Sequence, residues 1–260
     1  MIEDDFTYVL RKSLLGHGLS PAEAAVKAGL PESDVLAFSR GHFSADIARK
    51  LAPVLGLQPE AFATHPDYEP TLVSSTAINR IILPFGDDTV NAWLIHHGEM
   101  NLLFDAGDIP GSCIKELDRL GVPKPDGVFI THPHGDHITD IPYLTLRGVV
   151  ACGWNVPGTR PVHPGETLDC GLVKLRTYEL SGHAVQGLGY FIEDLPDPIF
   201  VVGDALFAGS IGGSPTQERY RQSLETLRSA LKDLPRNTIL LPGHGPATRL
   251  SEELARNPFL

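Results

Sequence analysis

The hydrophobic pattern changes character near residue 70. Before that point, apolar residues recur at helical spacing, as Ile47, Leu51 and Leu55 do. Beyond it, they form short apolar runs that end in turn residues, which is the pattern of β-strands. A helical stripe of leucines returns at residues 217–234. The expected strands span residues 78–83, 92–95, 102–104, 128–130, 149–151, 172–180, 188–192, 199–202 and 238–241.

The first 66 residues carry repeated helix-capping signals. Ser20 is followed after three positions by Glu23, which predicts a capped helix start, and Gly29 ends that helix. Ser44 caps a later helix. We therefore expect a small all-α domain over residues 1–66. In helix lengths and residue pattern, this segment resembles a repressor-type helix-turn-helix.

A proline-containing linker is expected over residues 67–74. The remainder, residues 75–260, mixes strands with helices along the chain. Such mixing predicts β-sheets covered by helices, an α/β fold class. We see no internal repeat and no low-complexity tract in the sequence.

A cluster of metal-ligating side chains follows the expected strand at residues 128–130. Residues 131–137 read THPHGDH, which places three histidines and an aspartate on one loop: His132, His134, Asp136 and His137. Rigid scaffolds commonly present catalytic groups on such loops. Imidazole nitrogen and carboxylate oxygen together suit Zn, Fe or Mn.

Three later positions strengthen the interpretation of a metal site. His183, Asp204 and His244 each follow an expected strand and each lie beside a glycine. A single case of this kind is more often structural than functional. Together with the 131–137 loop, the three positions give a set of five histidines and two aspartates.

These residues resemble the metallo-β-lactamase superfamily, and most closely its glyoxalase II-like branch. The matching pieces also include the strand 90–95, the turn 105–108 and the segment 242–246. The resemblance covers about residues 75–260 and implies an αββα sandwich. It also implies two metal ions. His132, His134 and His183 would hold the first, Asp136, His137 and His244 would hold the second, and Asp204 would bridge them.

The resemblance implies a glyoxalase II-like binuclear metallo-hydrolase that acts on a thioester, ester or lactone through a metal-bound hydroxide. Asp136 could also orient that hydroxide. Zn is the first choice of metal, with Fe or Mn as alternatives. Asp105 would support the ligand loop, and Asp108 is expected to be a turn residue. We expect His96, His97 and His163 to be packing or surface residues.

The segment after Asp204 departs from true glyoxalase II. Relatives that cleave glutathione thioesters supply a lysine and a tyrosine here, whereas residues 205–214 contain neither. S-lactoylglutathione is therefore not the expected substrate. The alternative enzyme is a persulfide dioxygenase, with one iron on His132, His183 and Asp204. A third class, a metal-sensing DNA-binding regulator, is the least favoured.

Charge argues against nucleic acid as a partner. The formal net charge of the chain is -11. Residues 1–67 contain six Lys or Arg and nine Asp or Glu, a net charge of -3. DNA-binding domains need a cationic surface. We expect a small-molecule substrate, no nucleic-acid or membrane partner, and leave a homodimer open.

The cysteines and the N-terminus favour a cytoplasmic protein. Three cysteines without a C-x-x-C pair do not form a disulfide framework. The first residues are acidic, unlike a signal peptide, and no apolar run in the sequence is long enough to span a bilayer. Native metal, substrate and oligomeric state are not determined by these patterns.

Overall fold

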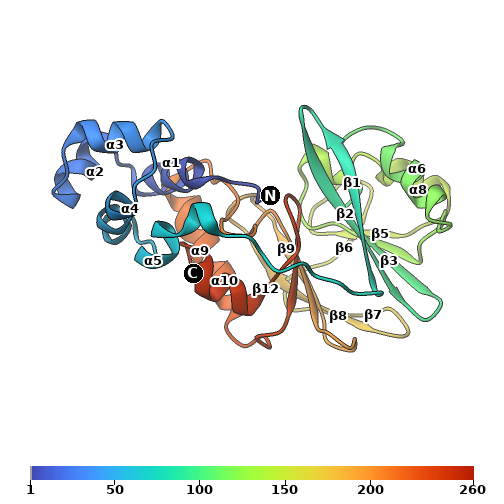
Figure 1. The fold of residues 1–260 in the computed structure, drawn as a ribbon. Coiled ribbons are helices and arrows are strands. Elements are labelled where there is room, and N and C mark those ends of the chain that lie inside the picture. The colour runs from blue at the N-terminus through green and yellow to red at the C-terminus, as the bar shows by residue number, and fades with distance from the viewer. Residues whose placement is uncertain (1) are drawn as a thin grey trace.

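The computed structural model describes residues 2–260 and shows two β-sheets packed face to face (Figure 1). Within these residues each sheet has six strands, in the orders β1-β2-β3-β4-β5-β6 and β12-β11-β10-β9-β8-β7. The first sheet comprises β1 (Ile78–Phe85), β2 (Asp88–His97), β3 (Met100–Phe104), β4 (Gly127–Phe129), β5 (Ala151–Gly153) and β6 (Arg160–Pro161). The second comprises β7 (Thr167–Asp169), β8 (Lys174–Glu179), β9 (Leu188–Ile192), β10 (Ile199–Gly203), β11 (Ile239–Pro242) and β12 (Thr248–Arg249).

Both sheets mix antiparallel hairpins with parallel pairs. In the first sheet, β1, β2 and β3 are antiparallel, while β3, β4, β5 and β6 run parallel. In the second sheet only β10 and β11 pair in parallel. Parallel pairs need crossover connections, and loops after their carboxyl ends meet at one edge of a sheet. This topology brings segments far apart in sequence to one edge of the sandwich.

Helices cover the outer faces of both sheets. On the first sheet lie α6 (Ser112–Arg119), α7 (Gly135–Ile138) and α8 (Ile141–Leu146). On the second lie α9 (Gln217–Leu231) and α10 (Leu250–Arg256). Alternation along β10 shows the layering, because Val201 faces the other sheet whereas Phe200 and Val202 face the helices. The expected αββα sandwich and α/β class are confirmed.

The chain before the sandwich is helical. Its elements are α1 (Phe6–His17), α2 (Pro21–Ala28), α3 (Glu32–Ser39), α4 (Ala45–Leu51), η1 (Ala52–Leu55), α5 (Pro59–Ala63) and η2 (His65–Asp67). The predicted capping box is present, with Ser20 and Glu23 bonded reciprocally. Figure 1 shows these helices at one end of the molecule, beside α9 and α10.

The helical region shares its hydrophobic core with the sandwich. Phe38 and Leu51 belong to the same buried cluster as Tyr220 and Leu227 of α9. The expected linker contributes as well, because Tyr68 is almost fully buried. Tyr68 donates a hydrogen bond to Glu253 of α10 at 2.6 Å. The division into domains at residues 66 and 75 stays a prediction.

The structure also bears on the cysteines and on membrane-spanning helices. All three cysteines are unpaired: Cys113 and Cys152 are buried and Cys170 is partly so. Burial raises the pKa of the Cys170 thiol to about 11, which makes it a poor nucleophile. Among residues 2–260, no helix combines the length and the apolar character that crossing a bilayer demands.

Candidate metal centre

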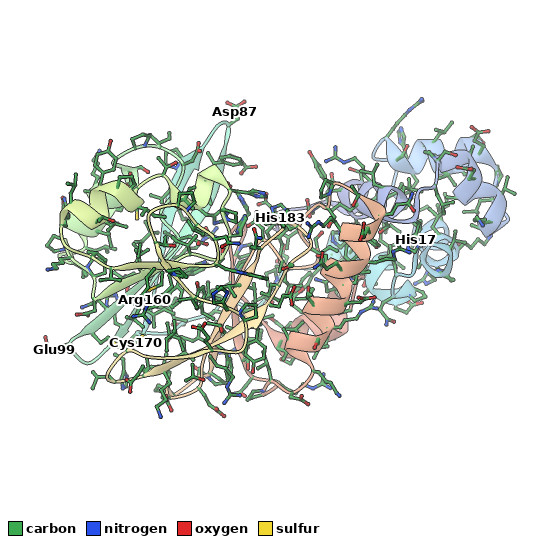
Figure 2. All side chains as sticks on the ribbon, turned by 180° about the vertical axis from the view of Figure 1, so that it is seen from behind. His17, Asp87, Glu99, Arg160, Cys170 and His183 are labelled. Carbon is green, nitrogen blue, oxygen red and sulfur yellow. The ribbon has the colours of Figure 1, made fainter. Side chains whose placement is uncertain are left out.

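All seven predicted ligand residues come together at one edge of the sandwich. The 131–137 loop follows β4, and His183 follows β8. Asp204 directly follows β10, and His244 lies two residues after β11. Figure 2 shows His183 between the sandwich and the N-terminal helices.

The seven side chains form two groups. Within each group, the candidate ligand atoms lie within 4.8 Å of one another. The first group is His132, His134 and His183, and the second is Asp136, His137, Asp204 and His244. His96, His97 and His163 belong to neither group, as the sequence predicts.

Asp204 contacts both groups. Its Oδ2 lies 3.4 Å from His183 Nε2 and 3.5 Å from His244 Nε2. Its Oδ1 lies 3.5 Å from His137 Nε2. A carboxylate at this position fits a bridge between two metal ions, because its two oxygens face ligands of both groups.

The protein holds one nitrogen of most of these histidines and leaves the other facing the centre. His183 Nδ1 donates to the Gly213 carbonyl at 2.7 Å, and His244 Nδ1 donates to the Thr89 carbonyl at 2.8 Å. His137 Nδ1 donates to Asp105 Oδ2 at 2.8 Å. Such contacts fix the tautomer and the ring orientation of a metal ligand.

Asp105 holds the 131–137 segment through hydrogen bonds. Its side chain is 1% exposed, and its Oδ1 accepts from the Thr131 backbone N–H at 2.8 Å. The backbone of Asp105 has a φ of 61°, which is uncommon for a residue with a side chain. The supporting role that the resemblance implied for Asp105 fits this geometry.

Buried polar atoms without partners test whether metal ions fit the site. His132 Nε2, His137 Nε2 and Asp204 Oδ1 are buried and have no hydrogen-bond partner. Buried polar groups in native proteins are normally satisfied. All three atoms point to the shared centre, so the donor set fits divalent metal ions.

The charges of the site point to the same conclusion. Burial alone would lower the pKa of His137, but Asp105 and Asp204 outweigh it and raise that pKa well above its ordinary value. Burial likewise acts against protonation of His244, yet Asp136 and Asp204 raise its pKa to about 10. The aspartate carboxylates of the site therefore favour positive charge beside them, which metal cations would supply.

Two glycines allow the backbone to approach the centre. A Cβ on Gly243 would lie 2.1 Å from Asp204 Oδ1. A Cβ on Gly212 would lie 1.9 Å from the Asp204 carbonyl oxygen. Neither position tolerates a side chain without displacing Asp204.

The surroundings of His244 include residues that the sequence did not predict. The rings of Phe85 and Phe207 lie 5.6 and 5.8 Å from that of His244. Glu3 is packed against Gly245, where a Cβ would lie 3.2 Å from the Glu3 Cβ. Burial raises the pKa of Glu3, and the nearby carboxylates of Asp88 and Asp4 raise it further against the opposing effect of His244. No sequence signal links these positions, which lie far apart along the chain.

Comparison with known proteins identifies relatives over the sandwich. Residues 85–174 match the family described as "Metallo-beta-lactamase superfamily". The Bacillus subtilis "Probable metallo-hydrolase YqgX" is 28% identical over 206 residues, covering 68% of this chain and 95% of that protein. A hydroxyacylglutathione hydrolase of Acidiphilium cryptum is 30% identical over 164 residues, covering 59% of this chain and 63% of its own length.

A solved structure gives the same similarity in three dimensions. TTHA1623, crystallised in a di-iron-bound form, superposes with a TM-score of 0.55 at 26% identity. The match covers 69% of this chain and all of that one. This chain spans less than two thirds of the Acidiphilium enzyme. The activity of that whole enzyme is therefore not transferred to this protein by similarity alone.

Proposed function

Because the chain contains a metallo-β-lactamase superfamily domain, we propose that it is a binuclear metallo-hydrolase that cleaves a thioester, an ester or a lactone. The observation that carries the proposal is the double ligand group sharing Asp204. His132, His134 and His183 would hold one metal, and Asp136, His137 and His244 the other. Zn suits this nitrogen and oxygen donor set, and the di-iron form of a related structure keeps iron as an alternative.

Two bound metals would lower the pKa of a shared water and polarise the substrate carbonyl. The protein's own residues would orient the reacting groups. Asp136 Oδ2 lies 3.3 Å from His244 Nε2, and its side chain is nearly buried, so this carboxylate could also orient a nucleophilic hydroxide. No serine or cysteine nucleophile is required.

The surroundings of His244 disfavour an anionic substrate such as a glutathione thioester. Glu3 places an acidic side chain near His244, and Asp88 lies near Glu3. Lys12 reaches the loop after Asp204, but its ammonium is paired with Asp4. The Lys12–Asp4 ion pair has no net charge to offer an anion. With Phe85 and Phe207 beside His244, we propose that the substrate group bound there is uncharged.

Metal stoichiometry with turnover in two variants tests the proposal. Asp136→Ala and His244→Ala remove ligands of the second group only. Each variant is expected to keep about one metal per chain and to lose at least about 100-fold in turnover of neutral thioesters, esters or lactones, because the metal pair is lost. His183→Ala is expected to deplete the first site.

The persulfide dioxygenase alternative predicts different results. Its single iron would need His132, His183 and Asp204 but not His244. One iron per chain, oxygen uptake that depends on persulfide, and a His244→Ala variant with near-normal turnover would together contradict the hydrolase. Metal content must be measured after loading purified apoprotein, since occupancy depends on how cells are grown.

A further inference from the structure

We propose that Lys12 in helix α1 is a positioning residue of the metal centre, acting through the backbone of residues 211–213 on His183. The inference rests on the proposed metal site and names a part of it contributed by the N-terminal helical region. No basic or metal-ligating motif marks Lys12 in the sequence, because 199 positions separate it from the residue it contacts.

The Lys12 ammonium has two oxygen partners, one from Ile211 and one from Asp4. Its Nζ donates to the Ile211 carbonyl at 2.7 Å and forms an ion pair with Asp4. The side chains of Lys12 and Asp4 are only 11% and 7% exposed. A buried ammonium with two oxygen partners has little freedom to move, so the carbonyl it binds is held in place.

The backbone that Lys12 holds is the backbone that orients a ligand. Two residues after Ile211, the Gly213 carbonyl accepts the Nδ1 hydrogen bond of His183. Between them, Gly212 is packed so tightly that a Cβ would lie 3.0 Å from His183 Nδ1. A displacement of Ile211 must therefore move the carbonyl that fixes the His183 ring.

Lys12 also reaches the second ligand group. Its Nζ lies 5.3 Å from the centre of the Phe207 ring, within cation–π distance. The Phe207 ring in turn packs edge-on against His244. One side chain of the helical region is thus linked to a candidate ligand of each group, to His183 through residues 211–213 and to His244 through Phe207.

Residues 209 and 210, which precede this backbone, are held by other side chains. Gly209 N–H donates to Glu253 at 3.0 Å, and Asn257 Nδ2 donates to the Ser210 carbonyl at 2.9 Å. His65 Nε2 lies 3.0 Å from the Gly209 carbonyl. Loss of Lys12 should therefore loosen residues 211–213 while residues 209 and 210 remain held, so along this loop the effect should fall on the Gly213 carbonyl that orients His183.

The test measures metal affinity and the Co²⁺ absorption spectrum of the full-length protein. Lys12→Met alone would leave the Asp4 carboxylate buried and unpaired, which is costly in itself. The informative variant is therefore Lys12→Met combined with Asp4→Asn. We expect it to bind the first Zn²⁺ about 10 to 100 times more weakly in chelator competition, as for other residues that orient ligands. The Co²⁺ bands should shift, because the His183 ring loses its fixed orientation.

Three control variants separate positioning from general stability. Asp4→Asn keeps the contact between Lys12 and Ile211 and leaves an amide oxygen to accept from the ammonium, so metal affinity should stay near that of the wild type even if the loss of charge lowers stability. Lys12→Arg keeps both donors and should do the same. Arg11→Met alters the neighbouring side chain of α1, which stacks on Tyr8, and should change nothing at the metal.

Unchanged Zn²⁺ affinity and Co²⁺ bands in the double variant would overturn the proposal, as would an equal loss in Asp4→Asn. If the double variant does not fold, Lys12→Gln decides, because its shorter side chain cannot reach both partners and should weaken binding in part. A Lys12→Gln protein with wild-type affinity would also overturn it. Failure of the hydrolase function is a separate result: two tightly bound metals with no turnover on any ester, thioester or lactone.

Discussion

Asp105 holds two parts of the candidate ligand segment without belonging to either ligand group. It binds the Thr131 N–H through one oxygen and His137 Nδ1 through the other. In Asp105→Asn the amide can still accept one hydrogen bond, but its NH₂ group faces a nitrogen that must donate. The favoured His137 tautomer would then be wrong for metal binding. We expect the second metal to bind about 10 to 100 times more weakly, measured by chelator competition.

A matched control is available in the same turn. Asp108 is partly exposed and belongs to neither ligand group. Asp108→Asn should keep both metals and full turnover. Equal losses of metal affinity in the two variants would show that general charge near the loop, not the His137 contact, governs binding.

The sequence predicted the seven candidate ligands for a physical reason. Each lies a few residues after a strand, on the connecting segment or in the short helix α7, so its position along the chain places it at a sheet edge. Glu3 and Lys12 lie on the N-terminal segment and reach the site only because that segment packs across the second sheet's helices. Contacts of this kind depend on tertiary packing, which local periodicity does not encode.

At the scale of elements, every expected strand overlaps an observed one, whereas β6, β7 and β12 were not predicted. β5 lies at Ala151–Gly153, two residues later than expected, because pairing with β4 sets its register. Val150, which the pattern included, is 56% exposed. The short strands β6, β7 and β12 offer too few residues for a pattern.

Helix α10 was missed because its buried face combines one leucine, Leu250, with polar residues. Glu253 and Asn257 are 0% and 1% exposed, and they bind the loop after Asp204 rather than a hydrophobic core. Hydrophobic periodicity detects an apolar face and passes over this one. The same feature explains why the support of residues 207–210 could not be read from the sequence.

A steric test at the element scale uses the turn after β11. Gly243 has no room for a Cβ, which would lie 2.1 Å from Asp204 Oδ1 and 2.7 Å from His137 Cε1. Gly243→Ala should therefore displace the bridging carboxylate and abolish binding of the metal pair. Metal content after reloading and turnover are the measurements.

Gly86, at the turn between β1 and β2, provides the control. Its φ is 55° and open space surrounds it, so an alanine there strains the backbone without a clash. Gly86→Ala should cost about 1 kcal/mol of stability yet keep both metals. A Gly243→Ala protein that also keeps two metals would show that the turn can relax away from Asp204.

For the whole molecule, the question is whether the helical region and the sandwich unfold together. Their shared cluster joins Leu10, Phe38 and Leu55 to Tyr220 and Leu227. A common core predicts one cooperative transition. The capping signals predicted the helices themselves, but nothing in the sequence indicated which surface they would cover.

Gly16 allows this shared core to be tested by a substitution whose normal effect is known. In a helix such as α1, replacing glycine by alanine usually stabilises by about 0.5–1 kcal/mol. Here the new Cβ would lie 2.3 Å from the ring of Tyr220 in α9. We therefore expect Gly16→Ala to destabilise the protein by about 1–3 kcal/mol, the usual cost of overpacking, and to lower the midpoint of a single thermal transition. In a Tyr220→Ala background the ring is gone, so adding Gly16→Ala should be neutral or stabilising. This change of sign in the free energy of unfolding measures the contact between Gly16 and Tyr220 directly. If Gly16→Ala stabilised the protein equally in both backgrounds, or if two separate transitions appeared, the helical region would not pack against α9 in solution.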